Sequence, residues 1–412
     1  MSASPLAAHT AAPRRWLSIV GIGEDGIEGL SPVARGLIAD AEIVFGGKRH
    51  LDLAGALIRG TVRPWPSPFD RAVTEVVEQR GRPVCVLASG DPFFYGVGAT
   101  LARHVDPGET LVVPGPSSFS LAAARLGWPL HETALLSLHG RPLDLIRPHL
   151  HPGARILALT PDSAGPEALA ALLADSGFGG SQVTVLEALG GPRERIRTAR
   201  AESFALADIA ALNVVALEVD AAPGARILAR APGLPDALFE HDGQITKREI
   251  RAVTLSSLAP RRNELLWDIG AGAGSVAIEW LLADPSLHAI AIEQRTDRAA
   301  RVRRNAAAFG VPGLEVVQGR APDALAGLAA PHAIFIGGGA KFSLDAATAA
   351  LRPGGRLVVN AVTLQTETLL SARYAALGGE LVRIALSRAE AMGGETGWRP
   401  ALPITQWVWT KP

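Results

Sequence analysis

Three glycines at alternate positions, Gly270, Gly272 and Gly274, form the segment of this 412-residue chain that points most directly to chemistry. They follow an apolar stretch that ends near Asp268, and an apolar helical pattern begins directly after them. Glycines at such a turn let the backbone approach a ligand closely and leave N–H groups free at the start of the helix. Glu293 ends a second apolar stretch about 20 residues later, where a carboxylate can accept both hydroxyls of a ribose. The spacing indicates a nucleotide-like ligand, although an ordinary tight turn would explain the glycines alone.

The segments beyond Glu293 distinguish between two kinds of nucleotide cofactor. They are GRAPDAL at 319–325, AIFIGGG at 333–339 and LRPGGRLVVN at 351–360. In this order they resemble the class I S-adenosylmethionine-dependent methyltransferases. The resemblance implies that the glycine turn holds the amino-acid end of the cofactor, the carboxylate its ribose, and the loop after 319 its adenine. The residues so assigned are Gly270, Ala271, Gly272, Ala273, Gly274, Glu293, Arg320 and Ala321.

The segment GQITKREIR at 243–251 resembles the entry to the small class I methyltransferases of the corrin pathway. By that resemblance Thr246 reaches the cofactor, and three cations lie near the substrate mouth, namely Lys247, Arg248 and Arg251. A capping box, in which Thr246 caps a helix and Glu249 returns the bond, explains the same residues structurally. The two interpretations are compatible.

Three other glycine-containing segments stand in the first half of the chain: VGIGEDGIEGLSP at 20–32, SGDPFFYG at 89–96 and VVPGPSSFSLAAARLGWP at 112–129. Together they resemble the tetrapyrrole methylase family, the class III S-adenosylmethionine methyltransferases. The family's usual first loop has Gly-Pro-Gly where Glu-Asp-Gly stands at 24–26, so the role of that loop stays open. The resemblance implies that the cofactor is contacted by Gly21, Ser89, Asp91, Phe94, Ser117 and Ser118.

Two sets of alternating strands and helices must position these residues. In the second half we expect a parallel core, because apolar runs of strand length alternate with amphipathic stretches. Its predicted strands are 265–268, 288–292, 314–318, 332–336, 355–360 and 404–409, and its predicted helices are 275–283, 296–309 and 342–351. In the first half, strands are predicted at 16–21, 41–45, 83–88, 155–160, 182–186 and 212–219, and a further strand begins at 109 and is broken at Pro114. Helices are predicted from 31 or 32, from 117 or 118 to 126, and at 166–176.

The predicted fold class is α/β, with an N-terminal two-lobed tetrapyrrole methylase fold followed by a C-terminal Rossmann-like class I sheet. Composition shifts to Pro, Gly and Ala near 221–240, which we interpret as a linker between domains at 14–220 and 241–412. No internal repeat occurs at a fixed period, and the two halves carry different glycine signatures. The chain is therefore a fusion and not a duplication.

A fusion of these families in this order resembles the bifunctional methyltransferases of cobalamin (corrin) biosynthesis. The resemblance implies one S-adenosylmethionine site per domain and a precorrin as substrate. It further implies that the N-terminal domain methylates carbon 5, while the C-terminal domain methylates carbon 15 and removes carbon dioxide from the acetate on carbon 12. Precorrin-6B would thereby become precorrin-8X.

The fourth strand of the C-terminal core is followed by bare glycine, with no side-chain base at 336–340. Such backbone leaves room for a flat substrate and suits an electron-rich bridge carbon as nucleophile. Decarboxylation needs an electron sink, which the conjugated imines of the substrate can supply without another cofactor. Arginines are expected to bind the substrate carboxylates. The substrate-site candidates are Lys247, Arg248, Arg251, Gly338, Arg388 and Arg399.

Composition limits the alternatives. Acidic and basic residues number 40 each, so no net field attracts nucleic acid, which argues against an RNA methyltransferase as the runner-up function. A non-catalytic S-adenosylmethionine sensor remains possible but is poorly motivated by two cofactor sites. The histidines His139, His149 and His151 suggest a metal, but no carboxylate or cysteine accompanies them at ligand spacing, and no metal is expected.

Cys85 is the single cysteine, so an internal disulfide is impossible and a reducing compartment fits. No apolar run is long enough to cross a membrane, and Met1 to Pro13 lacks the features of a signal peptide. We therefore expect a cytoplasmic protein. Because relatives of both halves associate, we also expect a homo-oligomer that acts on a small molecule and binds neither nucleic acid nor membrane.

Overall fold

The computed structural model describes residues 15–412, which divide into two compact units. Unit 1 runs to Arg141 and continues with Pro152–Ala225, whereas unit 2 comprises Pro142–His151 and Arg226–Pro412. The stretch in which no signal peptide was predicted and the first residue of the predicted N-terminal domain lie outside the described residues. The division after Ala225 falls within the stretch predicted as a linker, and the extents of the two domains stay predictions.

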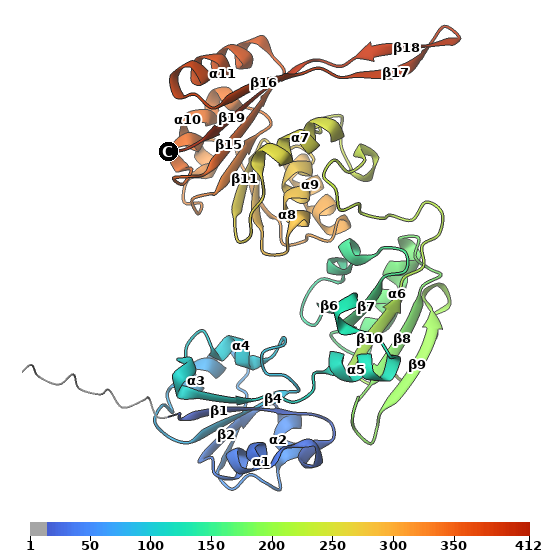
Figure 1. The fold of residues 1–412 in the computed structure, drawn as a ribbon, viewed down its shortest axis with the longest axis vertical. Helices are drawn as coiled ribbons and strands as arrows, with labels where there is room; N and C mark the ends of the chain where they lie inside the picture. The colour runs from blue at the N-terminus through green and yellow to red at the C-terminus, as the bar shows by residue number, and fades with distance from the viewer. Residues whose placement is uncertain (1–14) are drawn as a thin grey trace, which may run out of the picture. The chain divides into compact units, whose positions relative to one another are not determined.

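The first sheet of unit 1 contains β1 (Leu17–Ile22), β2 (Ile43–Gly46), β3 (Thr61–Pro64), β4 (Val84–Ser89) and β5 (Thr110–Val113). Its strands are parallel and lie in the order β3-β2-β4-β1-β5. The helices around it are α1 (Pro32–Ala39), α2 (Lys48–Ala54), α3 (Ala72–Val77) and α4 (Val97–Leu101). Apolar residues of α1 and α2 pack on one face and those of α3 and α4 on the other (Figure 1). Helices on both faces explain why the central strands are apolar throughout.

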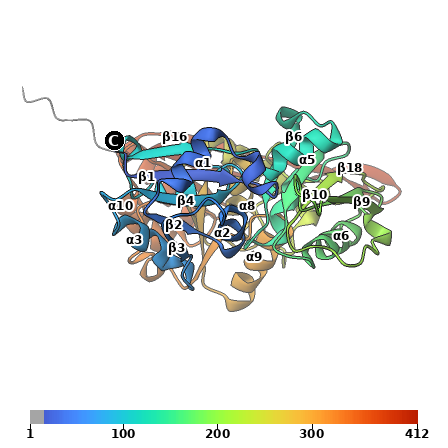
Figure 2. The ribbon, with the colours of Figure 1, turned by 90° about the horizontal axis from the view of Figure 1, so that it is seen from below.

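The second sheet of unit 1 contains β6 (Thr133–Ser137), β7 (Arg155–Leu159), β8 (Gln182–Glu187), β9 (Arg195–Arg200) and β10 (Asn213–Glu218). The order is β6-β7-β10-β8-β9, and all pairs except β6 with β7 are antiparallel. The helices are α5 (Ser118–Leu126) and α6 (Gly165–Asp175), which lie on opposite sides of the strands (Figure 2). Phe119 of α5 anchors the core between this helix and the sheet.

Unit 2 is built on a seven-stranded sheet in the order β13-β12-β11-β14-β15-β19-β16. Its strands are β11 (Leu265–Ile269), β12 (His288–Glu293), β13 (Glu315–Gln318), β14 (Ala333–Ile336), β15 (Arg356–Ala361), β16 (Glu380–Ile384) and β19 (Ile404–Thr410). The first five are parallel, whereas β19 runs antiparallel to both of its neighbours. The strand order reverses at β11, which is where open α/β sheets bind ligands at the carboxyl ends of their strands.

The helices of unit 2 are α7 (Arg248–Leu258), α8 (Ser275–Ala283), α9 (Thr296–Ala308), α10 (Ala340–Ala350) and α11 (Leu364–Leu377). Helices α7, α8 and α9 pack on one face of the sheet, and α10 and α11 pack on the other (Figure 1). A two-stranded hairpin of β17 (Ser387–Met392) and β18 (Glu395–Pro400) projects from the sheet. It is solvent-exposed along almost its whole length.

Short 3-10 helices complete the described chain, at Gly26–Gly29, Phe69–Arg71, Pro107–Glu109, Leu130–Glu132, Leu143–His149, Ala201–Ser203, Asp236–Leu238 and Asp323–Leu325. The helix Leu143–His149 lies in the segment Pro142–His151, which belongs to unit 2 although the chain before and after this segment belongs to unit 1. A Cβ added at Gly310 would lie 2.4 Å from Pro148 Cδ, so this helix packs directly against the end of α9.

The predicted α/β class, the two-lobed first half and the Rossmann-like second half are confirmed. The pattern did not predict β3, β6, β9 or the hairpin, which are short or exposed strands. The expected capping box is wrong, because α7 begins at Arg248 after Lys247 and no side chain caps it. Glu249 instead accepts a hydrogen bond from Arg388 at 2.5 Å.

No helix in residues 15–412 is long and apolar enough to cross a membrane. Within the same residues no three His, Cys, Asp or Glu side chains gather at a distance suited to a metal. Cys85 is free and buried, and burial raises the pKa of its thiol to about 12, so the group is an inert part of the core.

Candidate functional site

The glycine turn of unit 2 lies at the carboxyl end of β11, in the middle of the sheet. Gly270, Gly272 and Gly274 have φ values of 73°, 60° and 75°, the left-handed region that glycine adopts without strain. The N–H groups of Gly270 and Ala271 donate to Ile292 O at 2.9 and 3.2 Å, which ties the turn to β12. These bonds fix the turn as a rigid cradle at the end of β11.

Two carboxylates flank this cradle. Glu293 Oε2 accepts the N–H of Gly272 at 2.9 Å, and its Oε1 accepts the N–H of Arg295 at 3.0 Å. Asp268 Oδ2 accepts the N–H of Ala277 at 3.1 Å, but its Oδ1 is buried without a partner. Burial, with a smaller contribution from Glu293, raises the pKa of Asp268 to about 7. Asp268 is only 1% exposed, so its carboxyl group holds the start of α8 beneath the cradle.

A cavity of about 800 Å³ opens from this cradle, large enough for a cofactor together with part of a substrate. The predicted cofactor residues that line it are Thr246, Gly270, Ala271, Gly272, Glu293, Arg320 and Ala321. Ala273 and Gly274 do not line it. Ala273 is buried, and a Cβ at Gly274 would lie 2.8 Å from Val302 Cγ1, so these two residues bring α8 against α9.

A loop at 240–246, which we call the covering loop, closes one side of the cavity. Residues Gly243, Gln244, Ile245 and Thr246 line the cavity, and a Cβ at Gly272 would lie 3.1 Å from Gln244 O. The covering loop therefore lies directly over the glycine turn. A side chain at position 272 would crowd this carbonyl oxygen and would be strained by the φ of 60°.

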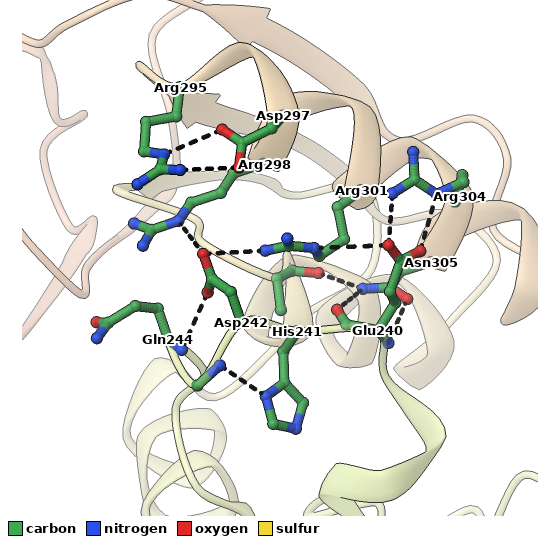
Figure 3. A network of polar contacts seen from close by, with 12 residues as sticks. Glu240, His241, Asp242, Gln244, Arg295, Asp297, Arg298, Arg301, Arg304 and Asn305 are labelled. Carbon is green, nitrogen blue, oxygen red and sulfur yellow. Dashed lines mark hydrogen bonds and ion pairs between the residues drawn. The ribbon is translucent and has the colours of Figure 1, made fainter.

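Arginines of α9 hold the covering loop in place (Figure 3). Asp242 accepts a hydrogen bond from Arg298 at 2.9 Å, lies 3.3 Å from Arg301 Nη1 and also accepts the N–H of Gln244 at 3.2 Å. The hydrogen bond from Arg298 is the main cause that holds the pKa of Asp242 well below its usual range. Glu240 is bound in turn by Arg304 and by the amide of Asn305. The loop is thus attached to α9 by both charge and backbone contacts.

The cavity extends past β14 into a second region, which we call the acceptor half. Its lining residues come from β14 onward in the chain and are Gly337, Gly338, Gly339, Phe342, Ser343, Asn360, Val362, Ile384, Leu386, Arg388, Ala401, Leu402 and Ile404. A Cβ at Gly338 would meet no heavy atom within 4 Å. The space predicted beside the glycine run is therefore present.

The six substrate-site candidates are divided by the structure. Lys247, Gly338 and Arg388 line the cavity, whereas Arg248 is exposed and lies outside it. Arg399 pairs with Glu390 at 2.9 Å on the hairpin, with 74% of its side chain exposed. Of the six candidates, Lys247 and Arg388 are therefore the cations placed to meet a carboxylate in the cavity.

Arg251 has a structural environment and does not reach the substrate mouth. Its side chain is fully buried, donates to Glu279 at 2.6 Å and pairs with Asp236 at 3.1 Å. It also donates to the carbonyl oxygens of Leu234 and Thr246. Because this fully buried side chain holds the segment before α7 and does not line the cavity, the expectation that Arg251 lies near the substrate mouth is corrected.

Several cavity residues were not found from the sequence. Arg298 lies in α9 and Phe342 in α10, and nothing in the sequence distinguishes them from other exposed helix residues. The Arg320 guanidinium lies over the Phe342 ring, 4.4 Å from its centroid. Asn360 is the second-last residue of β15, and a polar residue near the end of a buried strand was the one signal that could have indicated it.

In unit 1 three backbone turns converge at the carboxyl ends of β1, β4 and β5. A Cβ at Gly21 would lie 1.7 Å from Gly90 O and 2.5 Å from Gly115 N, and Gly115 N donates to Gly90 O at 3.0 Å. No other residue can occupy position 21 without displacing the neighbouring turns. This close approach brings the predicted cofactor residues at 89–94 and 117–118 together at the carboxyl ends of these strands.

Ser89 lies in a polar cluster at this edge. Its Oγ is 2.8 Å from His50 Nε2 and accepts a hydrogen bond from Arg49 at 2.9 Å, and Arg49 also pairs with Glu24. Burial, followed by the charge of Arg49, lowers the pKa of His50 to about 4, so its imidazole is neutral near pH 7. Glu24, the departure from the usual first loop, thus neutralises an arginine beside Ser89.

The other predicted residues of unit 1 have mainly local contacts. Asp91 accepts the N–H of Phe93 at 2.8 Å, and Ser117 caps α5 by accepting the N–H of Ser120 at 3.1 Å. Ser118 is the first residue of α5. Phe94 remains 36% exposed while its ring contacts Phe119 at a centroid distance of 5.2 Å.

Known protein families match both halves of the chain. A family model described as Tetrapyrrole (Corrin/Porphyrin) Methylases matches residues 17–205, and one described as Precorrin methyltransferase domain matches residues 237–411. A Sinorhizobium sp protein named Precorrin-6Y C(5,15)-methyltransferase [decarboxylating] is 61% identical over 398 residues, which is 96% of each chain. A protein of the same name from Mycobacterium tuberculosis (strain ATCC 25618 / H37Rv) is 41% identical over 95% of this chain and 99% of its own.

Among solved structures, the C-terminal domain of precorrin-6Y C5,15-methyltransferase from Rhodobacter capsulatus is 48% identical. It covers 45% of this chain and 100% of its own, with a TM-score of 0.43.

Proposed function

The chain belongs to the precorrin-6Y C(5,15)-methyltransferase (decarboxylating) family, and we propose that each of its two units binds one molecule of S-adenosylmethionine. As a member of this family it is an S-adenosylmethionine-dependent enzyme of cobalamin biosynthesis that methylates a precorrin on carbons 5 and 15 and decarboxylates it. The runner-up function, methylation of RNA, is not favoured.

The division of labour is part of the proposal. Unit 1 methylates carbon 5, and unit 2 methylates carbon 15 and removes carbon dioxide from the acetate on carbon 12, which converts precorrin-6B to precorrin-8X. The observation that supports methyl transfer in unit 2 is its cavity, because its glycine cradle and acceptor half form one continuous space. A methyl donor and a macrocycle can therefore meet in it.

In unit 2 the residues act mainly by position. Gly270 and Gly272 bring bare backbone to the amino-acid end of the cofactor, and each oxygen of Glu293 keeps a lone pair for a ribose hydroxyl. When bound, the cofactor supplies a methyl group on a sulfonium. The protein holds that group in line with the accepting carbon and excludes water, which can account for much of the rate.

The macrocycle is held by its carboxylates. Lys247 and Arg388 stand at the cavity, and Arg388 already binds Glu249, so a substrate carboxylate can replace or share that partner. The bare glycines at 337–339 leave space for the flat ring. A base is not required to generate the nucleophile, because a bridge carbon of a reduced tetrapyrrole is already electron-rich.

In unit 1 the convergence of Gly21, Gly90 and Gly115 supports a cofactor site at the carboxyl ends of β1, β4 and β5. Ser89, Asp91, Phe94, Ser117 and Ser118 remain the proposed contacts. The hydroxyl of Ser89 is oriented by His50 and Arg49, which gives it a defined direction at the edge of the sheet.

The proposal is tested by inactivating each site separately in the full chain. Gly21→Val is expected to abolish methylation of carbon 5, and Gly270→Val is expected to abolish methylation of carbon 15 together with carbon dioxide release. Equilibrium dialysis with labelled donor should give two sites in the wild type and one in each variant. A single site in the wild type, or loss of the same product from both variants, would refute the proposal.

We also propose a cytoplasmic homo-oligomer that does not bind nucleic acid. Light scattering of the purified chain measures the oligomeric state, and a monomer at micromolar concentration would contradict the first part. Retention of RNA at low salt would contradict the second, and fractionation of cells tests the location.

A further inference from the structure

The acceptor half of the unit 2 cavity is largely apolar, with a single oriented amide in its wall. Val362, Leu386 and Leu402 are among its apolar lining residues. Of the polar side chains among the described lining residues of this half, Ser343 donates back to Gly339 O at 3.2 Å, and Arg388 pairs with Glu249. The remaining one is Asn360, at the carboxyl end of β15.

A buried polar network fixes the direction of the Asn360 amide. Its Nδ2 donates to Thr254 Oγ1 at 3.0 Å, and its Oδ1 accepts from Gln406 Nε2 at 2.9 Å. Gln406 Nε2 also lies 3.2 Å from Thr254 Oγ1, and Gln406 Oε1 accepts from Ser257 at 2.9 Å. The network joins α7, β15 and β19, which are far apart in the sequence.

The partners of Asn360 have no access to solvent. Thr254 is 0% exposed and Gln406 is 1% exposed. Buried polar groups cost free energy when they lose their partners, so these buried hydrogen bonds restrict the Asn360 amide to one orientation. One Nδ2 hydrogen of Asn360 is used by Thr254, and the other is left for a group in the cavity.

The charge of the group that donates a hydrogen bond to the substrate carboxylate affects how easily that carboxylate leaves as carbon dioxide. A cation would stabilise the carboxylate strongly, and that stabilisation would be lost when neutral carbon dioxide forms. A neutral amide orients the carboxylate with much weaker stabilisation. Val362 and Leu402 of the cavity wall are 57% and 75% exposed without a ligand, so a bound macrocycle would cover them. The water that this displaces from around the carboxylate further favours the neutral product.

We propose that Asn360 selects the acetate that is decarboxylated, by donating its free N–H to that carboxylate within the apolar wall. This inference rests on the proposed function of unit 2. The other substrate carboxylates meet cations such as Lys247 and Arg388 and are retained. The amide holds the bond between the methylene and carboxylate carbons across the plane of the ring, where its electrons overlap the conjugated system.

The step balances within the substrate and solvent. The bond between the methylene and the carboxylate carbon breaks, its electron pair enters the conjugated imines, and carbon dioxide leaves. A proton from water then reaches the methylene carbon when the electrons return, which leaves a methyl group. No oxidant or reductant is needed.

The test compares Asn360→Leu and Asn360→Lys with the wild type in the full chain, with a precorrin and labelled donor. Leucine removes the donor at similar volume, and lysine replaces it with a cation. We expect carbon dioxide release to fall by about tenfold or more in both, as the loss of an orienting contact implies. Methylation of carbon 5 and donor affinity at unit 2 should stay at wild-type levels, and mass spectrometry should detect a product that keeps the acetate.

Two further variants sharpen the result. Thr254→Val removes one anchor of the amide and should lower carbon dioxide release in the same direction but less. Gln365→Leu removes an exposed amide at α11 and should change nothing. Wild-type carbon dioxide release from the Asn360 variants would overturn the inference, and so would a parallel loss of donor affinity at unit 2, since Asn360 would then only support the fold. A wild-type chain that releases no carbon dioxide would overturn the proposed function itself.

Discussion

The N–H of Gly272 donates to Glu293 Oε2 at 2.9 Å, so the glycine turn after β11 and the end of β12 form one rigid unit. The same carboxylate accepts a second backbone N–H through its other oxygen. A free carboxylate would rotate between several orientations, whereas this one presents its remaining lone pairs in fixed directions. The proposed ribose site therefore exists before the cofactor arrives.

Replacing Glu293 with Ala should weaken donor binding at unit 2 alone. Hydrogen bonds to charged groups contribute about 1.5–3 kcal/mol each, so we expect the dissociation constant to rise at least about tenfold. Calorimetric titration of the full chain should then resolve one weak and one unchanged site. Equal weakening at both sites, or at neither, would contradict the assignment of Glu293.

Asp268 should make the stability of the ligand-free chain fall as pH rises. Burial raises its folded-state pKa to about 7 from 3.8, so between these values the folded chain binds a proton that the unfolded chain has released. The free energy of unfolding therefore decreases with pH across this window, by at most about 1.4 kcal/mol per pH unit from this group. Urea unfolding of the wild type and Asp268→Asn from pH 5 to 8 measures it. The difference in free energy of unfolding between the wild type and Asp268→Asn should become smaller or change sign toward pH 7. A difference that stays constant with pH would refute the prediction.

The ion pairs of the covering loop should make donor binding at unit 2 sensitive to salt. Asp242→Asn leaves the loop with weaker contacts to Arg298 and Arg301, so we expect a few-fold rise in the dissociation constant and a faster release of donor. Stopped-flow measurements at low and high salt test both effects. The control is Asp345→Asn, which removes the exposed partner of Arg373 on α10 and should alter neither quantity.

Arg388 and Arg399 provide a matched pair of arginines that face each other across the hairpin register. Arg388 lines the cavity and Arg399 does not, so only Arg388→Ala should raise the substrate KM, by about tenfold for one charge-assisted hydrogen bond. Steady-state rates of methylation at carbon 15 provide the measurement. Equal effects of the two substitutions would mean that the hairpin, and not the cavity, binds the substrate.

The local sequence pattern was sufficient to predict the glycine turn and the strands around it. Residues 265–274 are a buried strand and a turn whose φ values only glycine adopts freely, and both properties depend on residues adjacent in the chain. The same is true of Ser117, which caps α5 as expected from its place after a Pro-Gly turn. The family resemblance could be recognised from the sequence because the structure of these segments depends on residues adjacent in the chain.

Contacts between distant segments decided the rest. Arg251 and Arg388 look alike as cations in the sequence, yet one is fully buried against Glu279 and the other lines the cavity. Asn360 gains its orientation from Thr254 and Gln406, 106 and 46 residues away. The amino-acid order alone thus determined the two scaffolds and their cofactor turns, since short-range geometry depends on neighbouring residues. Only tertiary packing decided which polar side chains face the cavity, because burial and hydrogen-bond partners arise when remote elements meet.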